Sequence, residues 1–469
     1  MNELTIELKQ DSEISLYEQI YRYIRTEIRN KNLGCGEKLP STRILCTHLQ
    51  VSRSTVLMAY DQLLSEGYIE AVPHKGYFVA DVEGLYDVKL VSEEKKTVTA
   101  EQEDCLYDFS PYGIDLDSFP FNNWRKITKN VLVDDNKELF ARGDAQGEEE
   151  FRKTISNYLY QSRGVVAKPQ NIIVGAGNEY LLILLNQLLT GEKTFAMENP
   201  TYRQTYRILN SLGEHVVTVG QDKNGMSVES LAKSGANIAY VMPSHQYPLG
   251  IVMPVKRRVE LLKWADGGDG RYIIEDDYDS EFRYRGKPIP ALCGFDKGQR
   301  VIYIGTFSKA IAPAIRMSYM VLPDGLMKQY HERIGFYSCT VSRIDQIVVK
   351  TFMESGCYEK HLNKMRALYK SRHDILLNEL EEFRQSFEIT GENAGIHLLL
   401  KSKDNVCEQE LIEKAKEKGV RVYPMSAYDI GKEKKEYHTV ILGYANLGEN
   451  EIRQGTALLK EAWGISSLP

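Results

Sequence analysis

The chain has 469 residues, of which 42% are hydrophobic and 26% charged, and its formal net charge is −6. This composition is typical of a soluble globular protein with two or three domains, and the charge argues against general coating of nucleic acid. Its seven cysteines form no Cys-x-x-Cys pair, which argues against a disulfide framework or a metal site. Residues 1–10 do not resemble a signal peptide, and the apolar stretch 180–189 is too short to cross a bilayer. We therefore expect a cytoplasmic protein without a membrane partner.

Residues 1–80 carry three helical patterns followed by a hairpin. Apolar residues recur every four positions from Leu16 to Ile28, and two shorter helical runs follow, each after a capping serine, Ser41 or Ser52. Two short β-rich runs around a Pro-His-Lys-Gly turn complete the region. Three helices and a hairpin in this order predict a winged helix-turn-helix. Its third helix would enter the major groove of DNA by its N-terminal end.

The start of the third helix is the candidate DNA-reading surface. Arg53 can reach guanine edges, and the hydroxyls of Ser54 and Thr55 can reach phosphates. Arg43 on the second helix and Lys75 at the wing tip flank them. Each of these residues alone is more often a solvated surface residue, and a helix-turn-helix can also be merely structural.

The first eighty residues resemble the DNA-binding domain of the GntR family of bacterial regulators. The resemblance rests on runs such as Leu39-Pro40-Ser41-Thr42-Arg43, Val51-Ser52-Arg53-Ser54-Thr55-Val56 and Gly76-Tyr77-Phe78-Val79. It implies binding to a double-stranded DNA operator. The residues implied at the DNA are Arg43, Arg53, Ser54, Thr55, Lys75 and Gly76.

Residues 81–106 change character, because they are charged and contain few large apolar residues. We interpret them as a flexible linker, with a short helix at Ser92–Lys96 as the alternative. From residue 107 to residue 469 globular composition resumes. Short β-rich runs alternate there with helical ones, which predicts a mainly parallel sheet covered on both faces. Ligands of such sheets bind beyond the carboxyl ends of the strands.

One lysine stands out in this second region. Lys309 follows the β-rich run 301–304, and a lysine at the end of a buried strand is costly unless its charge is neutralised or used. One use is a Schiff base with a carbonyl cofactor. Thr306, Ser308 and Arg316 could then hold a phosphate. A lone Ser-Lys pair more often marks a surface lysine, so the case depends on the other strand ends.

Three other strand ends carry matching residues. A Gly-Ala-Gly turn opens a helix after the first strand and could bind a phosphate, although a tight turn explains it equally well. Tyr202 could lie against a flat ligand or simply pack in the core. Asp276 follows a strand directly, and a buried carboxylate needs a positive partner, such as a protonated pyridine nitrogen. Tyr278 could bond the phenolic oxygen of the same ring. Solvation or a divalent ion are the alternatives for this acidic run.

Together these residues predict a pyridoxal phosphate (PLP) site without a metal. Lys309 would bind the aldehyde, and no other catalytic residue is assigned. The predicted cofactor contacts are Lys309, Asp276, Tyr278, Tyr202, Ala176, Gly177, Thr306, Ser308 and Arg316.

The second region resembles aspartate-aminotransferase-like enzymes, with a large domain at about 145–330 and a small α+β domain at about 333–469. The whole chain resembles the MocR branch of the GntR family, on runs such as Asn199-Pro200-Thr201-Tyr202, Pro243-Ser244-His245-Gln246 and Thr306-Phe307-Ser308-Lys309. The resemblance implies a transcription regulator that senses PLP itself, an amino acid or an amine. It also implies a swapped, head-to-tail homodimer.

One departure from the resemblance bears on activity. Aminotransferases carry an arginine for the substrate carboxylate, which we place near residues 439–445, and this chain has none there. Arg203, Arg207 and Arg421 are the candidate substitutes, although surface positions are expected for them. Without this bidentate contact, efficient transamination is not expected, and we predict a sensor and not an enzyme. The competing hypotheses are a working aminotransferase with a vestigial DNA domain, and a DNA-binding protein whose second domain only dimerises.

Overall fold

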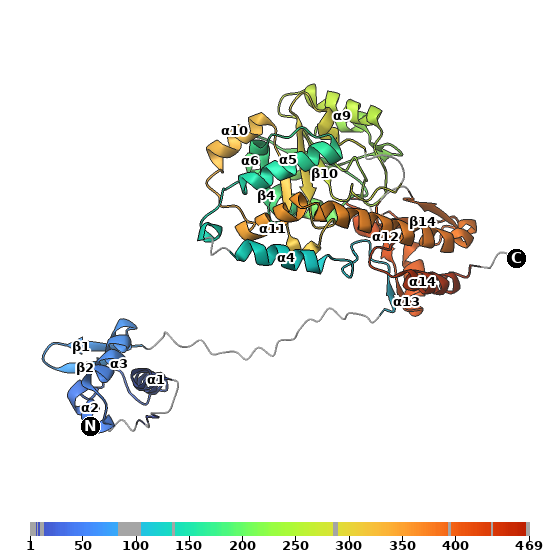
Figure 1. Ribbon diagram of the computed structural model, residues 1–469. Coiled ribbons are helices and arrows are strands. Elements are labelled where there is room, and N and C mark those ends of the chain that lie inside the picture. Colours follow the sequence, from blue (N-terminus) through green and yellow to red (C-terminus); the bar gives the residue numbers. More distant parts are fainter. Residues whose placement is uncertain are drawn as a thin grey trace. The chain divides into compact units, whose positions relative to one another are not determined.

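The computed structural model describes residues 6, 8–9, 14–82, 105–133, 137–284, 289–392, 395–432 and 435–465. The chain divides into two compact units, 1–102 and 103–469, which Figure 1 draws and which are described separately here. Most of the predicted linker, residues 83–104, lies outside the described residues, and so does its alternative helix. No helix within the described ranges combines the length and the apolar character that a membrane span needs.

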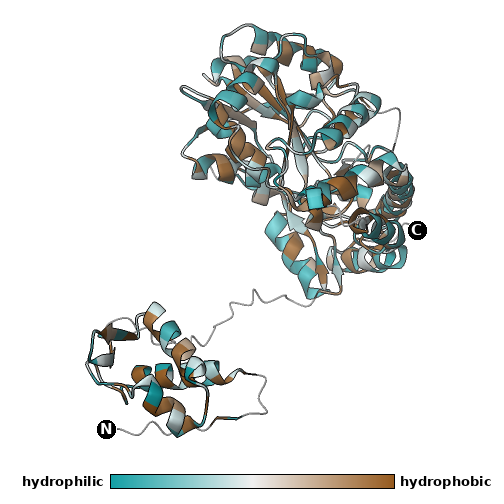
Figure 2. Cartoon of the chain, turned by 60° about the vertical axis from the view of Figure 1, so that its left-hand side comes forward, coloured by the Kyte–Doolittle hydropathy of each residue, from teal (hydrophilic) through white to brown (hydrophobic). Residues whose placement is uncertain are grey.

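The first unit is the predicted winged helix-turn-helix. Its elements are α1 (Leu16–Arg29), α2 (Thr42–Leu49), α3 (Arg53–Ser65), β1 (Ile69–Val72) and β2 (Gly76–Val79). The two strands pair as an antiparallel hairpin. Both predicted caps are confirmed, because the Ser41 hydroxyl accepts a hydrogen bond from the Ile44 N–H, and the Ser52 hydroxyl accepts one from the Thr55 N–H. In Figure 2 these helices carry hydrophobic and hydrophilic residues side by side, as amphipathic helices around a small core do.

A seven-stranded sheet forms the centre of the second unit. In spatial order its strands are β4 (Ile172–Gly175), β12 (Ser318–Val321), β11 (Val301–Thr306), β10 (Tyr272–Asp277), β9 (Ile238–Val241), β5 (Thr194–Glu198) and β6 (His215–Val219). Only β12 runs antiparallel to its neighbours within this sheet. The predicted mainly parallel sheet is confirmed, and β12 makes it mixed.

Both faces of this sheet are buried, which explains its continuous apolar strands. Along β11, Ile302 and Ile304 belong to one hydrophobic cluster, while Tyr303 between them belongs to another. The helices of this part of the unit are α4 (Phe121–Leu132), α5 (Glu149–Arg163), α6 (Asn178–Leu188), α7 (Arg203–Ser211), α8 (Val228–Lys233), α9 (Val255–Asp266), α10 (Asp324–Arg333) and α11 (Arg343–Glu354). Between β6 and α8 the chain forms a short antiparallel ribbon of two strands, β7 (Gln221–Asp222) and β8 (Gly225–Met226).

A smaller antiparallel sheet follows towards the C-terminus. Its spatial order is β13 (Phe387–Thr390), β14 (His397–Ser402), β17 (Thr439–Gly443) and β16 (Tyr423–Pro424). The remaining elements are α12 (Cys357–Glu379), α13 (Glu408–Glu417), α14 (Glu449–Ala462), and the paired β3 (Tyr107–Asp108) and β15 (Val420–Arg421). Leu398 and Leu442 face a core that α13 and α14 share, whereas Leu399 and Ile441 join the cluster of the large sheet. The small sheet therefore has one face turned towards the large one.

The small domain is expected to start at about residue 333, and the packing of α11 bears on this boundary. The helix α11 begins after that point, yet its Val348 and Phe352 pack in the same cluster as Phe151 of α5. It also contacts α4 extensively. The boundary between the large and small domains thus stays a prediction, with α11 on the side of the large sheet.

Candidate cofactor and effector site

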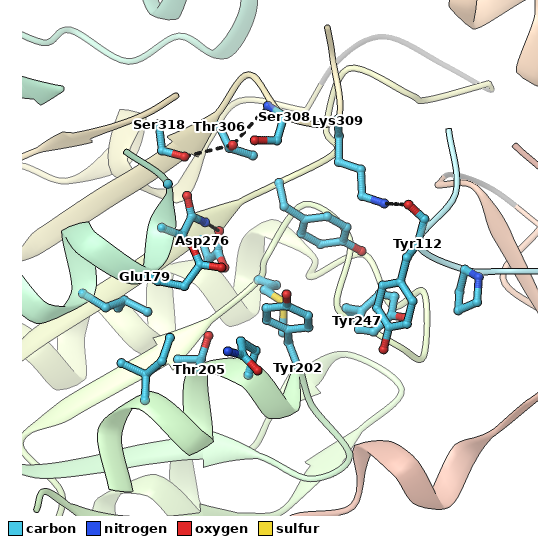
Figure 3. A pocket seen from close by; sticks show the side chains of 18 of the residues that line it. Tyr112, Glu179, Tyr202, Thr205, Tyr247, Asp276, Thr306, Ser308, Lys309 and Ser318 are labelled. Atoms are coloured by element: carbon cyan, nitrogen blue, oxygen red, sulfur yellow. Dashed lines mark hydrogen bonds between the residues drawn. The ribbon is translucent and has the colours of Figure 1, made fainter. Parts of the chain in front are cut away.

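A pocket of about 150 Å³ lies at the carboxyl ends of the central strands, next to the start of α6 (Figure 3). This is the place expected for a ligand on such a sheet. Of the nine predicted cofactor contacts, eight line the pocket: Lys309, Asp276, Tyr278, Tyr202, Gly177, Thr306, Ser308 and Arg316. Ala176 is not among the lining residues, and its backbone N–H donates to the Thr340 hydroxyl at 3.0 Å.

Lys309 is half-buried, three residues beyond the end of β11. Its Nζ donates a hydrogen bond to the carbonyl oxygen of Tyr112 at 2.8 Å, and Figure 3 shows these two residues side by side, with Asp276 on the other side of the pocket. Desolvation lowers the pKa of the amine to about 8, against the opposing pull of the Asp279 carboxylate. A useful fraction of the amine is therefore uncharged near neutral pH, as a nucleophilic lysine requires.

Asp276 is the buried carboxylate of the pocket. It accepts hydrogen bonds from the Asn178 amide at 3.1 Å and from the Tyr240 hydroxyl. Desolvation raises its pKa to about 7, although the Tyr240 bond opposes this and stabilises the charged form. A cationic partner would stabilise the ionised form further, because a buried charge costs free energy unless it is paired.

The other acidic residues of this run have different partners. Asp277 forms a buried ion pair with Arg163 at 2.8 Å and accepts a hydrogen bond from the Tyr303 hydroxyl at 2.6 Å. Asp279 bonds His245 Nδ1 at 2.8 Å. These carboxylates are buried, which contradicts the solvated alternative for the acidic run. Among the described residues, no group of three or more His, Cys, Asp or Glu side chains is placed to hold a metal.

Hydroxyl groups and one guanidinium also line the pocket. The Thr306 hydroxyl accepts hydrogen bonds from the Ser318 hydroxyl at 2.9 Å and from the Ser308 N–H at 3.2 Å. Gly177 precedes α6 with φ 96°, and a Cβ there would collide with the Arg316 guanidinium. The helix start therefore stays open for an anion between backbone N–H groups and Arg316.

The donor set fits PLP. A helix start cleared by Gly177 can hold the phosphate, Asp276 can pair with a protonated ring nitrogen, and Lys309 offers an amine for the aldehyde. The buried Asn178 Oδ1 beside Asp276 has no hydrogen-bond partner among the described residues, so this end of the pocket still has a free polar atom.

The DNA-facing candidates lie on the surface of the first unit. Arg53 and Ser54 are exposed at the start of α3, and Arg43 and Lys75 are exposed on α2 and at the wing. Thr55 is only half-exposed, and its hydroxyl shares a hydrogen bond of 2.7 Å with the capping Ser52. Gly76 has φ 110°, a conformation that only glycine adopts readily, so it shapes the wing turn.

Known proteins match both units. Residues 16–79 match the gntR family of bacterial regulatory proteins, and residues 112–438 match aminotransferase class I and II. The uncharacterized HTH-type transcriptional regulator YdeL of Bacillus subtilis is 40% identical over 467 residues, 99% of this chain and 100% of that protein. The chain belongs to the family of GntR-type regulators with an aminotransferase-like domain.

Other proteins similar to this regulator include two further regulators and a solved aminotransferase. The probable rhizopine catabolism regulatory protein MocR of Rhizobium meliloti is 30% identical, over 97% of this chain and 95% of that protein. The pyridoxine biosynthesis regulator PdxR of Corynebacterium glutamicum is 29% identical, over 98% of each chain. The kynurenine aminotransferase of Pyrococcus horikoshii, solved in complex with PMP, has a TM-score of 0.68 and 26% identity over 77% of this chain and 91% of that one.

The pocket of the regulator also contains residues that the sequence analysis did not single out. Tyr112 comes from the chain entry into the second unit, Tyr247 from the loop after β9, and His397 from the small sheet. The hydroxyls of Tyr112 and Tyr247 both bond the Tyr428 hydroxyl, at 2.6 and 2.9 Å. Tyr112, Tyr247, His397 and Tyr428 come together only in the tertiary structure. No local sequence signal therefore marks them.

The regulator places the candidate substitute arginines away from the pocket. Arg203 and Arg207 are exposed on α7 and do not line it, and Arg421 lies 3.9 Å from Asp108. Among the described lining residues, Arg316 is the sole arginine, and it pairs with Glu179 at 2.6 Å.

Proposed function

We propose that this regulator binds PLP through Lys309 and changes its affinity for an operator when PLP or an amine occupies the pocket. The observation that carries the proposal is the half-buried Lys309 amine, with its pKa lowered to about 8, in one pocket with the buried Asp276. Both lie on a chain whose first unit exposes Arg53 at a helix start. PLP, when bound, supplies an aldehyde and an electron-accepting ring.

Different residues of the pocket bind different groups of this cofactor. Lys309 attaches the aldehyde, Asp276 stabilises a protonated ring nitrogen, and Tyr278 meets the ring hydroxyl. Tyr202 packs against the ring. The N–H groups at the start of α6, with the remaining donors, hold the phosphate. These donors are Gly177, Thr306, Ser308 and Arg316, while the N–H of Ala176, the ninth predicted contact, is engaged by Thr340.

Tyr112 offers a route from the pocket to the rest of the chain. Its carbonyl oxygen accepts the hydrogen bond of Lys309, and it lies four residues after β3, close to the chain entry into this unit. When Lys309 binds the cofactor, its amine leaves this carbonyl, so the segment before Tyr112 loses one contact in the occupied state. A difference in contacts between two states is what coupling between sites requires.

We also propose a swapped, head-to-tail homodimer. The support is the likeness of the whole chain to the regulators above, and a dimer would present two helix-turn-helix units to two half-sites. The working-aminotransferase hypothesis has weaker support. Relatives that match nearly the whole chain are named as regulators, while an aromatic-amino-acid aminotransferase of Thermococcus litoralis is 27% identical over 74% of it.

The direct test is binding to the DNA just upstream of the protein's own gene. By fluorescence anisotropy at moderate salt, we expect the full-length protein to bind this fragment more tightly than a shuffled fragment of equal length. Adding PLP should change the dissociation constant by at least about fivefold, the lower range of allosteric coupling. Absence of specific binding, with and without PLP, would refute the proposal.

The rate of PLP attachment should follow the protonation of Lys309. Its pKa of about 8 lies below the ordinary value of 10.5, so the uncharged, nucleophilic amine accumulates as pH rises towards 8. We expect the rate of visible band formation in stopped-flow absorbance to rise about tenfold from pH 6 to 7 and to level off above about pH 8.5. A small peptide lysine serves as the control, and its rate should keep rising towards pH 10. A protein rate that also rises to pH 10 would contradict this prediction.

A further inference from the structure

We infer that the effector of this pocket is a primary amine with an apolar or aromatic tail and no carboxylate. The inference rests on the proposed function, because the amine would act at the cofactor that Lys309 holds. It narrows the effector classes named above, which include amino acids. Three features of the pocket wall support it: an apolar sheet face, an uncharged histidine and a cluster of tyrosine rings.

His397 of β14 and the preceding Ile396 line the pocket, and the face of the small sheet that His397 shares continues into apolar residues. In its register Leu399 pairs with Ile441, and Ile441 pairs with Tyr423 on the next strand. His397 lies two residues before Leu399, so strand alternation puts both on one face, and His397 lines the pocket. Leu399 and Ile441 are buried in the same cluster as Tyr247. A carboxylate that reached this face would lose its water without gaining a charged partner there.

His397 contributes a ring to this wall without contributing charge. Burial, together with the neighbouring His245 and Lys309, lowers its pKa to about 3, so the ring is neutral at physiological pH. Its Nε2 is already bonded to the Pro248 carbonyl oxygen at 2.8 Å. It therefore acts as a flat, uncharged surface rather than as an anion-binding group.

Tyr112 and Tyr247 line the pocket and belong to a cluster of tyrosine rings that includes Tyr423 and Tyr428. The ring of Tyr112 lies 6.3 Å from that of Tyr247, 6.4 Å from that of Tyr423 and 6.5 Å from that of Tyr428. The hydroxyls are largely engaged with one another, and the Tyr423 hydroxyl donates to the Asp108 carboxylate at 2.9 Å. The rings are thus fixed and offer apolar surface.

The cations of the described lining have other roles. In the proposed function the Lys309 amine bonds to the cofactor aldehyde. Arg316 pairs with Glu179 and lies against Gly177 at the start of α6, which is the phosphate end of the pocket. The positive charges therefore gather where the cofactor is held, and the effector tail meets the apolar end.

Phenethylamine and L-phenylalanine test the inference, because they differ only by the carboxylate. PLP-saturated full-length protein would be titrated with each, and absorbance and operator anisotropy would be recorded. We expect phenethylamine to act at a concentration at least about tenfold lower than phenylalanine. Equal or stronger action of phenylalanine, or no action of either, would overturn the inference. A protein that never forms a PLP band would instead refute the proposed function.

Two variants locate the selectivity in the pocket wall. Ile396→Arg places a guanidinium in the pocket lining beside His397 and should reverse the preference towards phenylalanine. Should this variant fail to fold because Ile396 is buried, Tyr112→Ala is the second test, since Tyr112 is 48% exposed. It should raise the half-effective phenethylamine concentration at least about fivefold while the PLP band stays. Tyr160→Ala, at a side chain 65% exposed on α5, is the matched control and should change nothing. Equal effects of the two tyrosine variants would overturn the inference.

Discussion

Replacing Lys309 by alanine is expected to abolish the visible absorbance band that the protein forms with PLP. The amine is the sole group in the described pocket wall that can bond covalently to an aldehyde while lying opposite the buried Asp276. Without it, only the phosphate donors and ring contacts hold the cofactor. We expect the PLP concentration needed for half-saturation to rise by about 100-fold, which corresponds to about 2.7 kcal/mol. Equilibrium dialysis measures this, since it does not depend on colour.

The DNA readout separates loss of sensing from loss of folding. Lys309→Ala should still bind the operator, because the change lies in the second compact unit, but PLP at wild-type concentrations should no longer alter that binding. Lys328→Ala is the matched control, because that lysine is 78% exposed and lies 3.9 Å from its acidic neighbour. If Lys309→Ala kept both the band and the response to PLP, another amine would hold the cofactor. If neither the wild type nor the variant formed a band or responded to PLP, the hypothesis that the second unit only dimerises would be supported.

Local patterns in the sequence predict where the main residues of the site lie on the sheet and where two helices of the first unit begin. Asp276 lies near the carboxyl end of the buried β10, and Lys309 comes three residues after β11, so their place at the sheet edge follows from chain direction alone. The caps at Ser41 and Ser52 also follow from neighbouring residues, because a hydroxyl two or three residues before a free N–H is a local device. These features depend on short stretches of chain, which is why they could be read without a structure.

The second set of pocket residues depends on long-range register and could not be predicted. Tyr240 lies inside β9 and is opposite Ile274, so its hydroxyl reaches Asp276 only through strand pairing. In the sequence it looks like one more apolar strand residue. His397 and Tyr112 come from segments 285 residues apart, and they meet only because the small sheet folds back on the large one. Packing of α11 on the large sheet likewise depends on tertiary contacts and not on its own sequence.

Replacing Arg53 by alanine is expected to weaken binding to the operator about 5- to 150-fold, or about 1–3 kcal/mol, for each half-site that the residue reads. Arg53 is the first residue of α3, its side chain is exposed, and the Ser52 hydroxyl caps the helix independently of it. Alanine has a higher helix propensity than arginine, so the fold should not suffer. The loss should therefore be one of contacts with DNA, and thermal melting of the variant should match that of the wild type.

The comparison of DNA sequences shows which kind of contact Arg53 makes. If it reads base edges, the variant should lose affinity for the operator but keep its affinity for a shuffled fragment, and the preference between the two should shrink. If it binds only phosphate, both affinities should fall together and the salt dependence should become shallower. Arg22→Ala on α1 is the matched control, since Arg22 is 54% exposed and pairs only with Glu18 in the same helix. Equal losses for the Arg22 and Arg53 variants would mean that net charge, and not the start of α3, governs binding, and the groove-reading role of this helix would have to be abandoned.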